Sequence, residues 1–87
     1  MTAKVEIYST QTCPYCVRAR NLLAKKGVAY IEYRVDQQPD LRGEMAQRSA
    51  GGTSVPQIFI DDRHIGGCDD MFELDFEGEL DKLLGLA

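Results

Sequence analysis

Residues 11–20 read QTCPYCVRAR, and this stretch decides how the chain folds around it. Two cysteines three positions apart enclose Pro14 and Tyr15, and they stand directly before an apolar run with helical spacing. Ahead of them, residues 5–8 (VEIY) alternate between apolar and other side chains, which predicts a short strand followed by a polar loop. The cysteine pair can therefore be a metal clip, a structural disulfide or a pair of thiols that reacts.

The residues after the pair predict a helix and then a second strand. Pro14 suits the first turn of a helix, where its missing N–H costs nothing. The helical spacing continues to Lys26, and Gly27 is placed to end the helix. Residues 30–35 (YIEYRV) alternate again and predict the second strand.

A second helix is expected after this strand. Asp36 is a candidate helix cap and Pro39 a helix-start residue, so we expect the helix to run from there to about Ser49. Residues 50–54 (AGGTS) then break regular structure.

The last third of the chain predicts a hairpin and a final helix. Residues 57–60 (QIFI) form a strand, a tight turn follows at residues 61–62, and residues 63–65 return as the second arm. Asp70 and Glu73 resemble a capping box, which would open a helix that continues to Leu84.

This order of elements predicts an α/β fold of one domain over residues 1–87. The first strand, helix and next strand form a right-handed crossover with parallel strands, whereas the closing hairpin must be antiparallel. We expect a four-stranded mixed sheet with three helices distributed over both faces.

Composition excludes several classes of function. A net charge of -4 over 87 residues offers no basic stripe for nucleic-acid phosphates. The N-terminal residues lack the apolar stretch of a signal peptide, and no segment is long and apolar enough to span a membrane. We therefore expect a cytoplasmic protein, and nothing suggests more than a monomer. Three cysteines are an odd number, which does not suit a secreted disulfide framework.

The placement of the two cysteines favours a reactive pair. Cys13 falls at or next to the helix N-cap, where unpaired backbone N–H groups and the helix dipole stabilise a thiolate. Cys16 lies three residues further on the same helix face, within reach of a disulfide, and we expect it to be the more buried thiol. Tyr15 would point outward beside the attacking sulfur, where it could line a groove.

Two other interpretations of the cysteines remain open at this point. The thiols could be buried and inert. Alternatively, Cys13, Cys16 and Cys68 with His64 could supply a zinc site of three cysteines and one histidine. A histidine between Arg63 and Ile65 on an exposed strand more simply faces solvent, which weakens the zinc interpretation.

Three motifs in this order resemble the glutaredoxins, and most closely their short bacterial dithiol type: CPYC (13–16), TSVPQIFI (53–60) and IGGCDD (65–70). The resemblance extends from about residue 5 to residue 84. It implies a thioredoxin-like fold and glutathione-dependent thiol-disulfide exchange. In this family Cys13 would be the nucleophile and Cys16 the resolving thiol, supported by Pro14, Tyr15 and a cis-proline at Pro56.

The resemblance also implies a glutathione site. This sequence differs from the usual family pattern at one residue of that site. A lysine usually stands three residues before the first cysteine, where this chain has Thr10, so we expect weaker glutathione binding. Arg42 is a possible substitute cation. The residues expected to contact glutathione are Thr10, Tyr15, Gln47, Ser54, Val55, Pro56, Gly67, Cys68, Asp69 and Asp70.

The resulting functional prediction is an enzyme that reduces protein disulfides with both cysteines and protein-glutathione mixed disulfides with Cys13 alone. Glutathione would be a co-substrate, with no tightly bound cofactor. Partners would be disulfide-containing or glutathionylated proteins, with ribonucleotide reductase among the possibilities. The alternative function is a glutathione-ligated iron-sulfur cluster carrier, which Pro14 and Cys16 disfavour. Any redox role for Cys68 is less expected than simple packing beside the groove.

Overall fold

Four strands and four helices follow one another along residues 3–86, the part of the chain that this computed structural model describes. The strands are β1 (Val5–Ser9), β2 (Ile31–Arg34), β3 (Gln57–Ile60) and β4 (Arg63–Gly66). The helices are α1 (Pro14–Lys25), α2 (Asp40–Arg48), α3 (Cys68–Phe76) and α4 (Glu79–Leu83). Within these residues, no helix has the length and apolar character needed to traverse a bilayer.

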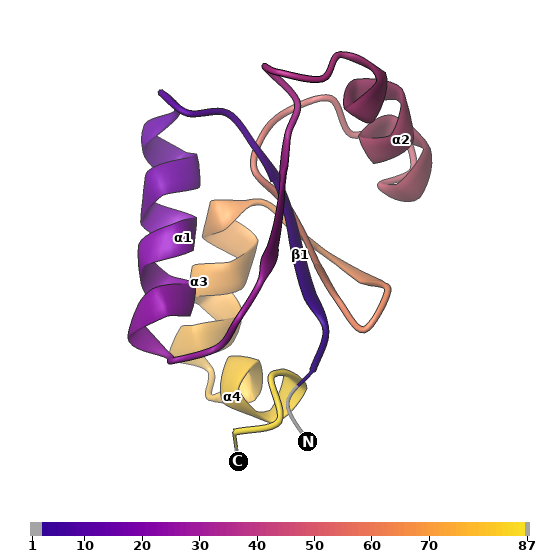
Figure 1. The fold of residues 1–87 in the computed structure, drawn as a ribbon. Coiled ribbons are helices and arrows are strands. Elements are labelled where there is room, and N and C mark those ends of the chain that lie inside the picture. The colour runs from indigo at the N-terminus through magenta and orange to yellow at the C-terminus, as the bar shows by residue number, and fades with distance from the viewer. Residues whose placement is uncertain (1–2, 87) are drawn as a thin grey trace.

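The predicted mixed sheet is confirmed. Its strands lie in the order β2-β1-β3-β4, with β1 parallel to β2 and antiparallel to β3, and with β4 antiparallel to β3. Figure 1 shows α1 and α3 side by side over one face of this sheet and α2 over the other. Asp61 and Asp62 form the predicted tight turn, and both have the positive φ angles of a hairpin turn.

The last helix differs from the prediction, because it begins earlier and is divided in two. Gly67 is the N-cap residue of α3, and the Asp70 carboxylate accepts a hydrogen bond from its N–H at 2.9 Å. Asp70 therefore lies inside the first turn and does not open the helix. Gly78, with a φ of 79°, then separates α3 from α4, so residues 3–86 contain four helices in place of the expected three.

The expected cap at Asp36 is also wrong. α2 begins at Asp40, directly after Pro39, with no side chain bonded to its first turn. The Asp36 carboxylate instead pairs with Arg34 at 2.7 Å and accepts from the Gln11 backbone N–H at 3.2 Å. It thus steadies the loop that leads into Cys13.

The two faces of the sheet have separate cores. The core under α1 and α3 contains apolar side chains from β1, β3, α1, α3 and α4. Ile7, Leu23 and Met71 are among those with no exposed surface. Under α2 the core is smaller and consists of Tyr8, Val35, Met45 and Phe59, with partly buried neighbours. Because Met45 is the one fully buried residue that α2 supplies, polar contacts must contribute to its attachment.

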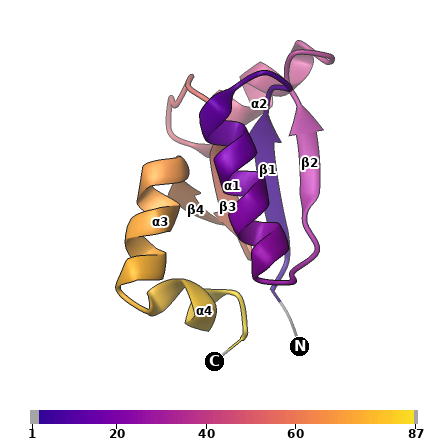
Figure 2. The same cartoon turned by 90° about the vertical axis from the view of Figure 1, so that its left-hand side faces the viewer.

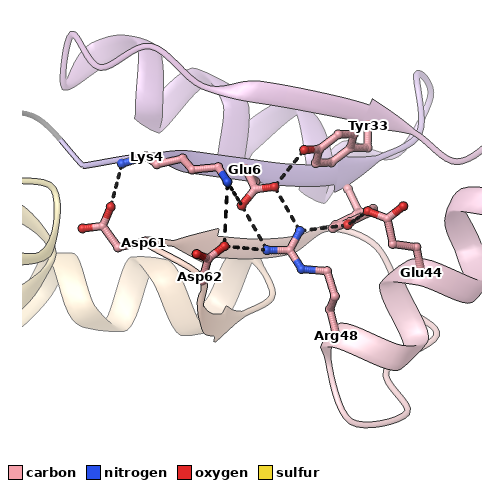
Figure 3. Close-up of polar contacts among 8 residues, drawn as sticks. Lys4, Glu6, Tyr33, Glu44, Arg48, Asp61 and Asp62 are labelled. Carbon is pink, nitrogen blue, oxygen red and sulfur yellow. Dashed lines mark hydrogen bonds and ion pairs between the residues drawn. The ribbon is translucent and has the colours of Figure 1, made fainter.

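These polar contacts centre on a buried carboxylate in β1. The Glu6 side chain is 4% exposed, and both of its oxygens accept from the Arg48 guanidinium at 3.0 Å (Figure 3). Tyr33 donates to the same carboxylate at 2.7 Å. The guanidinium also lies 4.1 Å from the ring centre of Phe59 and donates to the Tyr8 hydroxyl. Arg48 thereby joins the end of α2 to the middle of the sheet.

We expect Glu6→Gln to lower the free energy of unfolding at pH 7 by about 2–3 kcal/mol, because it leaves Arg48 without its charged partner. The Arg48 hydrogen bonds hold the pKa of Glu6 below its ordinary value of 4.5. Stability gained from this ionisation is complete above the unfolded-state pKa and is lost as the pH falls through the folded-state pKa. Urea unfolding should therefore show the difference between wild type and variant shrinking below pH 4.5.

The matched control is Glu79→Gln, which breaks an ion pair between two exposed side chains one helical turn apart, Lys82 and Glu79. It should cost less than about 0.5 kcal/mol at either pH. A Glu6 variant as stable as this control would contradict the role assigned to the buried carboxylate.

Candidate active site

Cys13 caps the N-terminus of α1, as the sequence predicts. Its backbone is extended, with φ of -77° and ψ of 118°, and its Sγ accepts from the backbone N–H of Cys16 at 3.4 Å. Pro14 occupies the first helical position, so no N–H is left unpaired there. The helix therefore turns its free amides toward one sulfur atom.

These amides make the Cys13 thiol more acidic. Burial of the sulfur opposes ionisation, whereas the N–H groups of Cys16 and Tyr15 and the Cys16 thiol favour it. Together with the positive charge of Arg20, they hold the pKa of Cys13 below the ordinary value of a cysteine. Arg20 is itself fixed by Glu32 at 2.8 Å and by the Thr10 carbonyl at 3.4 Å.

Cys16 is the opposite kind of thiol. It has no exposed surface and lies on the core side of α1, which confirms the expectation that it is the more buried of the two. Burial raises the pKa of Cys16 to about 11, and the neighbouring charge of Cys13 adds to this effect. One sulfur is thus prepared to attack, while the other stays protonated behind it.

A groove of about 230 Å³ opens beside Cys13, between the start of α1, the loop before β3 and the start of α3. The Val55–Pro56 peptide bond is cis, as expected, and the Val55 carbonyl accepts from the Cys13 thiol at 3.8 Å. The residues that line the groove are Tyr15, Ser54, Val55, Pro56, Gly67, Cys68, Asp69 and Asp70.

The α3 side of the groove depends on a turn that only glycine can form easily. Gly66 has a φ of 120°, and a Cβ built on it would lie 2.3 Å from a carboxylate oxygen of Asp70. That oxygen accepts the Gly67 N–H and thereby fixes the start of α3. The amides of the next residues belong to the first helical turn and have no acceptor within the helix. The groove consequently has unpaired N–H donors and two aspartates at one end.

The loop before β3, which forms another side of the groove, is supported by hydrogen-bonded side chains that the sequence analysis did not identify. The Gln57 amide donates to the Ser54 carbonyl at 3.0 Å and pairs with the ring of His64 at 2.7 Å. Gln57 is 6% exposed, and the His64 ring packs against Phe59. The available signal was a single polar residue, Gln57, at the start of an otherwise apolar strand, because a buried amide needs hydrogen-bond partners.

Two residues expected at the site, Thr10 and Gln47, do not line the groove. Thr10 lies in the loop before α1, where its carbonyl binds Arg20 and its backbone N–H faces Cys16. Gln47 is exposed on α2. Arg42, the possible substitute cation, is also exposed on α2, and no carboxylate of residues 3–86 lies within 4.0 Å of it.

The cysteines and His64 do not assemble into a zinc site. Over residues 3–86, no three histidine, cysteine or acidic side chains come close enough together to hold a metal ion. The His64 ring is hydrogen-bonded to Gln57 and packs against Phe59, on the face of the sheet that α2 covers. Burial raises the pKa of Cys68, which lines the groove as a neutral thiol.

Comparison with known proteins places this geometry among relatives. A family model described as Glutaredoxin matches residues 5–65. Glutaredoxin 3 of Escherichia coli is 57% identical over 82 residues, which cover 94% of this chain and 98% of that protein. The dithiolic glutaredoxin 2-C-Grx1 of Trypanosoma brucei brucei superposes with a TM-score of 0.85 at 45% identity, over 94% of this chain and 87% of that one. A buckwheat glutaredoxin-glutathione complex superposes with a TM-score of 0.87 at 31% identity, over 95% and 77%.

We expect iodoacetamide to alkylate Cys13 far faster than the other two thiols at pH 7, because only the thiolate reacts. The rate at Cys13 should rise with a midpoint below the value of about 8.5 for free cysteine. Mass spectrometry of peptides from the quenched protein would locate the label at each pH.

Cys68→Ser is the control, since it removes a buried neutral thiol and should leave the titration midpoint unchanged. A midpoint at or above that of free cysteine would show that the helix amides do not stabilise the Cys13 thiolate.

Proposed function

Since this chain belongs to the glutaredoxin family and is a glutathione-dependent thiol oxidoreductase, we propose that it uses two mechanisms. Protein-glutathione mixed disulfides are reduced by Cys13 alone, and protein disulfides by Cys13 and Cys16 together. The observation that carries this proposal is the pairing of an acidic, accessible sulfur with a buried thiol of raised pKa one helical turn away.

In the first mechanism the Cys13 thiolate attacks the glutathione sulfur of the mixed disulfide. The protein thiolate leaves and takes up a proton, and Cys13 now carries glutathione in a disulfide bond. A second glutathione thiolate attacks the glutathione sulfur of that bond. Glutathione disulfide departs and the Cys13 thiolate is restored. One free glutathione is therefore oxidised for each protein thiol released, and the other half of the glutathione disulfide comes from the substrate.

In the second mechanism the Cys13 thiolate attacks one sulfur of a protein disulfide and forms a mixed disulfide with it. The other substrate sulfur leaves as a thiolate and takes up a proton. The charge on Cys13 disappears in this step, which removes one of the causes that raise the pKa of Cys16. Cys16 then loses its proton and attacks the Cys13 sulfur, and the second substrate thiol leaves. Two molecules of glutathione reduce the Cys13–Cys16 disulfide and are released as glutathione disulfide.

The groove suits glutathione as the group that Cys13 must meet. An extended tripeptide can pair with the backbone of Val55 as an added strand. The free N–H groups at the start of α3, near Cys68 and Asp69, suit the α-carboxylate of the γ-glutamyl residue. A carboxylate of Asp69 or Asp70 suits its ammonium group, and Asp70 has one oxygen not used by Gly67.

The glycyl end of glutathione would extend toward Thr10 and Gln47, beyond the described lining of the groove. Neither side chain carries a charge, so neither replaces the lysine that the family resemblance leads us to expect at position 10. Arg42, which is exposed on α2 as Gln47 is, is the candidate substitute cation. Tyr15 and Ser54 would contact the peptide between the two ends.

The setting of this activity follows from the same chemistry. We propose that one domain over residues 1–87 acts as a monomer in the cytoplasm, where the glutathione pool keeps such a pair reduced. Its substrates would be glutathionylated and disulfide-containing proteins, without any tightly bound cofactor.

The iron-sulfur carrier remains the weaker alternative. A carrier needs Cys13 as a cluster ligand that is not captured by a second thiol. Cys16 stands directly behind Cys13, and Pro14 fixes the turn between them. This arrangement favours disulfide formation over cluster binding.

We expect Cys13→Ser to abolish activity in an assay coupled to glutathione reductase and NADPH, on both a small glutathione mixed disulfide and a protein disulfide. Cys16→Ser should keep activity on the mixed disulfide and lose it on the protein disulfide, because its absence leaves the mixed intermediate unresolved. Activity retained by the Cys13 variant would overturn the proposal. A brown, cluster-loaded wild type after anaerobic reconstitution, together with an inactive enzyme, would instead favour the carrier.

We expect Thr10→Lys to lower the apparent KM for glutathione several-fold, since a charge-assisted hydrogen bond contributes about 1.5–3 kcal/mol and partial exposure reduces it. Steady-state kinetics with varied glutathione would measure the change. Ala29→Lys adds the same charge at an exposed position after α1 and should have no effect. An unchanged KM in Thr10→Lys would mean that the missing lysine does not limit glutathione binding.

A further inference from the structure

A second depression continues from the groove along α1. Arg18, Leu22 and Lys25 follow Tyr15 at helical spacing, so the four side chains share one stripe of the helix. Tyr15 lines the groove beside Cys13, whereas the other three line a depression of about 350 Å³ together with Asn21 and Phe72. We call this depression, formed by residues 18, 21, 22, 25 and 72, the α1–α3 seam.

The α3 side of the seam is apolar. Phe72 and Phe76 are four residues apart and therefore lie on the same face of α3. Phe76 is 93% exposed, which is unusual for so large an apolar side chain. The acidic residues Asp70, Glu73 and Glu77 line a different depression, on the side of α3 that faces β4. The seam thus combines aromatic surface with an absence of carboxylates among its lining residues.

The two cations of the seam are not neutralised. Within residues 3–86, six of the ten lysines and arginines form ion pairs, for example Lys26 with Asp75 at 2.6 Å. Arg18 and Lys25 have no carboxylate of these residues within 4.0 Å. Arg18 lies instead 5.3 Å from the ring centre of Phe72. In a chain of net charge -4, the seam is a local positive site.

We propose that the α1–α3 seam binds the segment that flanks the reactive cysteine of a protein disulfide substrate, and that this segment is extended, acidic and partly aromatic or aliphatic. The proposal rests on the proposed function and specifies its substrate class. Carboxylates of the segment pair with Arg18 and Lys25, and its apolar side chains cover Phe72 and Phe76. Charge complementarity identifies the occupant, since a basic segment would be repelled by the two cations.

The arrangement of the helices sets the spacing of the segment. Figures 1 and 2 show α1 and α3 side by side, with both N-termini at the end of the molecule where the groove lies. At about 1.5 Å per residue along the helix, Arg18 is roughly 8 Å and Lys25 roughly 18 Å from Cys13 along the axis. An extended chain covers these lengths in about 2 and about 5 residues. Acidic residues at those distances from the substrate cysteine would meet the two cations.

The seam should matter for protein substrates and not for small ones. Glutathione occupies the groove next to Cys13 and does not reach Lys25. Loss of the seam's charge should therefore reduce kcat/KM for an acidic disulfide substrate while leaving that for a small glutathione mixed disulfide unchanged.

The test compares two disulfide peptides that have glutamates or glutamines 2 and 5 residues from the reactive cysteine. We expect wild type to prefer the glutamate peptide and the double variant Arg18→Glu/Lys25→Glu to lose about 5- to 20-fold in kcat/KM on it, since each pair contributes up to about 1 kcal/mol and reversal adds repulsion. The wild-type preference should fall with added salt. Arg63→Glu is the matched control and should retain the preference. Arg63 is exposed on β4, and no carboxylate of residues 3–86 lies within 4.0 Å of it.

Each outcome has a distinct meaning. Equal losses on both peptides and on the small mixed disulfide, or no preference for glutamate in wild type, would overturn the seam proposal and leave the proposed function intact. A wild type inactive on the small mixed disulfide would contradict the proposed function itself. If wild type sediments as a dimer that Phe76→Ser dissociates and shows no peptide preference, then the seam binds a second copy of the chain and the proposal is wrong.

Discussion

The convergence of the first amides of α1 on the sulfur of Cys13 is the interaction on which the site depends. Burial alone would keep this thiol neutral, and the helix N-terminus reverses that effect. The same helix places Cys16 one turn further and in the core, where burial outweighs the effect of the Thr10 N–H and keeps the pKa of Cys16 raised. Two identical side chains thus acquire opposite properties from positions three residues apart on one element.

The remaining structure supports this helix and the groove beside it. The large core holds α1 and α3 on one face of the sheet, so that both helix N-termini meet at the same end. On the other face, the Glu6–Arg48 contact holds the end of α2, from which the chain continues directly into the loop carrying Ser54, Val55 and Pro56. Gln57 then fixes that loop, because its side-chain amide donates a hydrogen bond to the Ser54 carbonyl. The groove is therefore assembled from three segments, each anchored by a different kind of contact.

The ends of α1 and the hairpin turn could be predicted from the backbone properties of single residues. Pro14 and Gly27 mark the ends of α1 because each has a backbone property that suits only that place, and the paired aspartates mark the hairpin turn for the same reason. The start of α3 was not predictable, since Gly66 and Gly67 are equally permissive and only the position of Asp70 decides between them. Nor could alternation in β1 reveal that Glu6 is buried, because its partner Arg48 is distant in the sequence. The groove-lining residues were all anticipated, whereas Thr10 and Gln47 lie outside the lining and Gln57 and His64 were missed.

The edges of the sheet have a consequence for behaviour at high concentration. Both edge strands, β2 and β4, are four residues long, and they carry the charged side chains Glu32, Arg34 and Arg63. The ladder between β3 and β4 is also irregular at Ile58 and Phe59. Short, charged or distorted edges offer a poor template for strands of other molecules. The fold therefore resists edge-to-edge aggregation, although every residue of the two central strands β1 and β3 is buried.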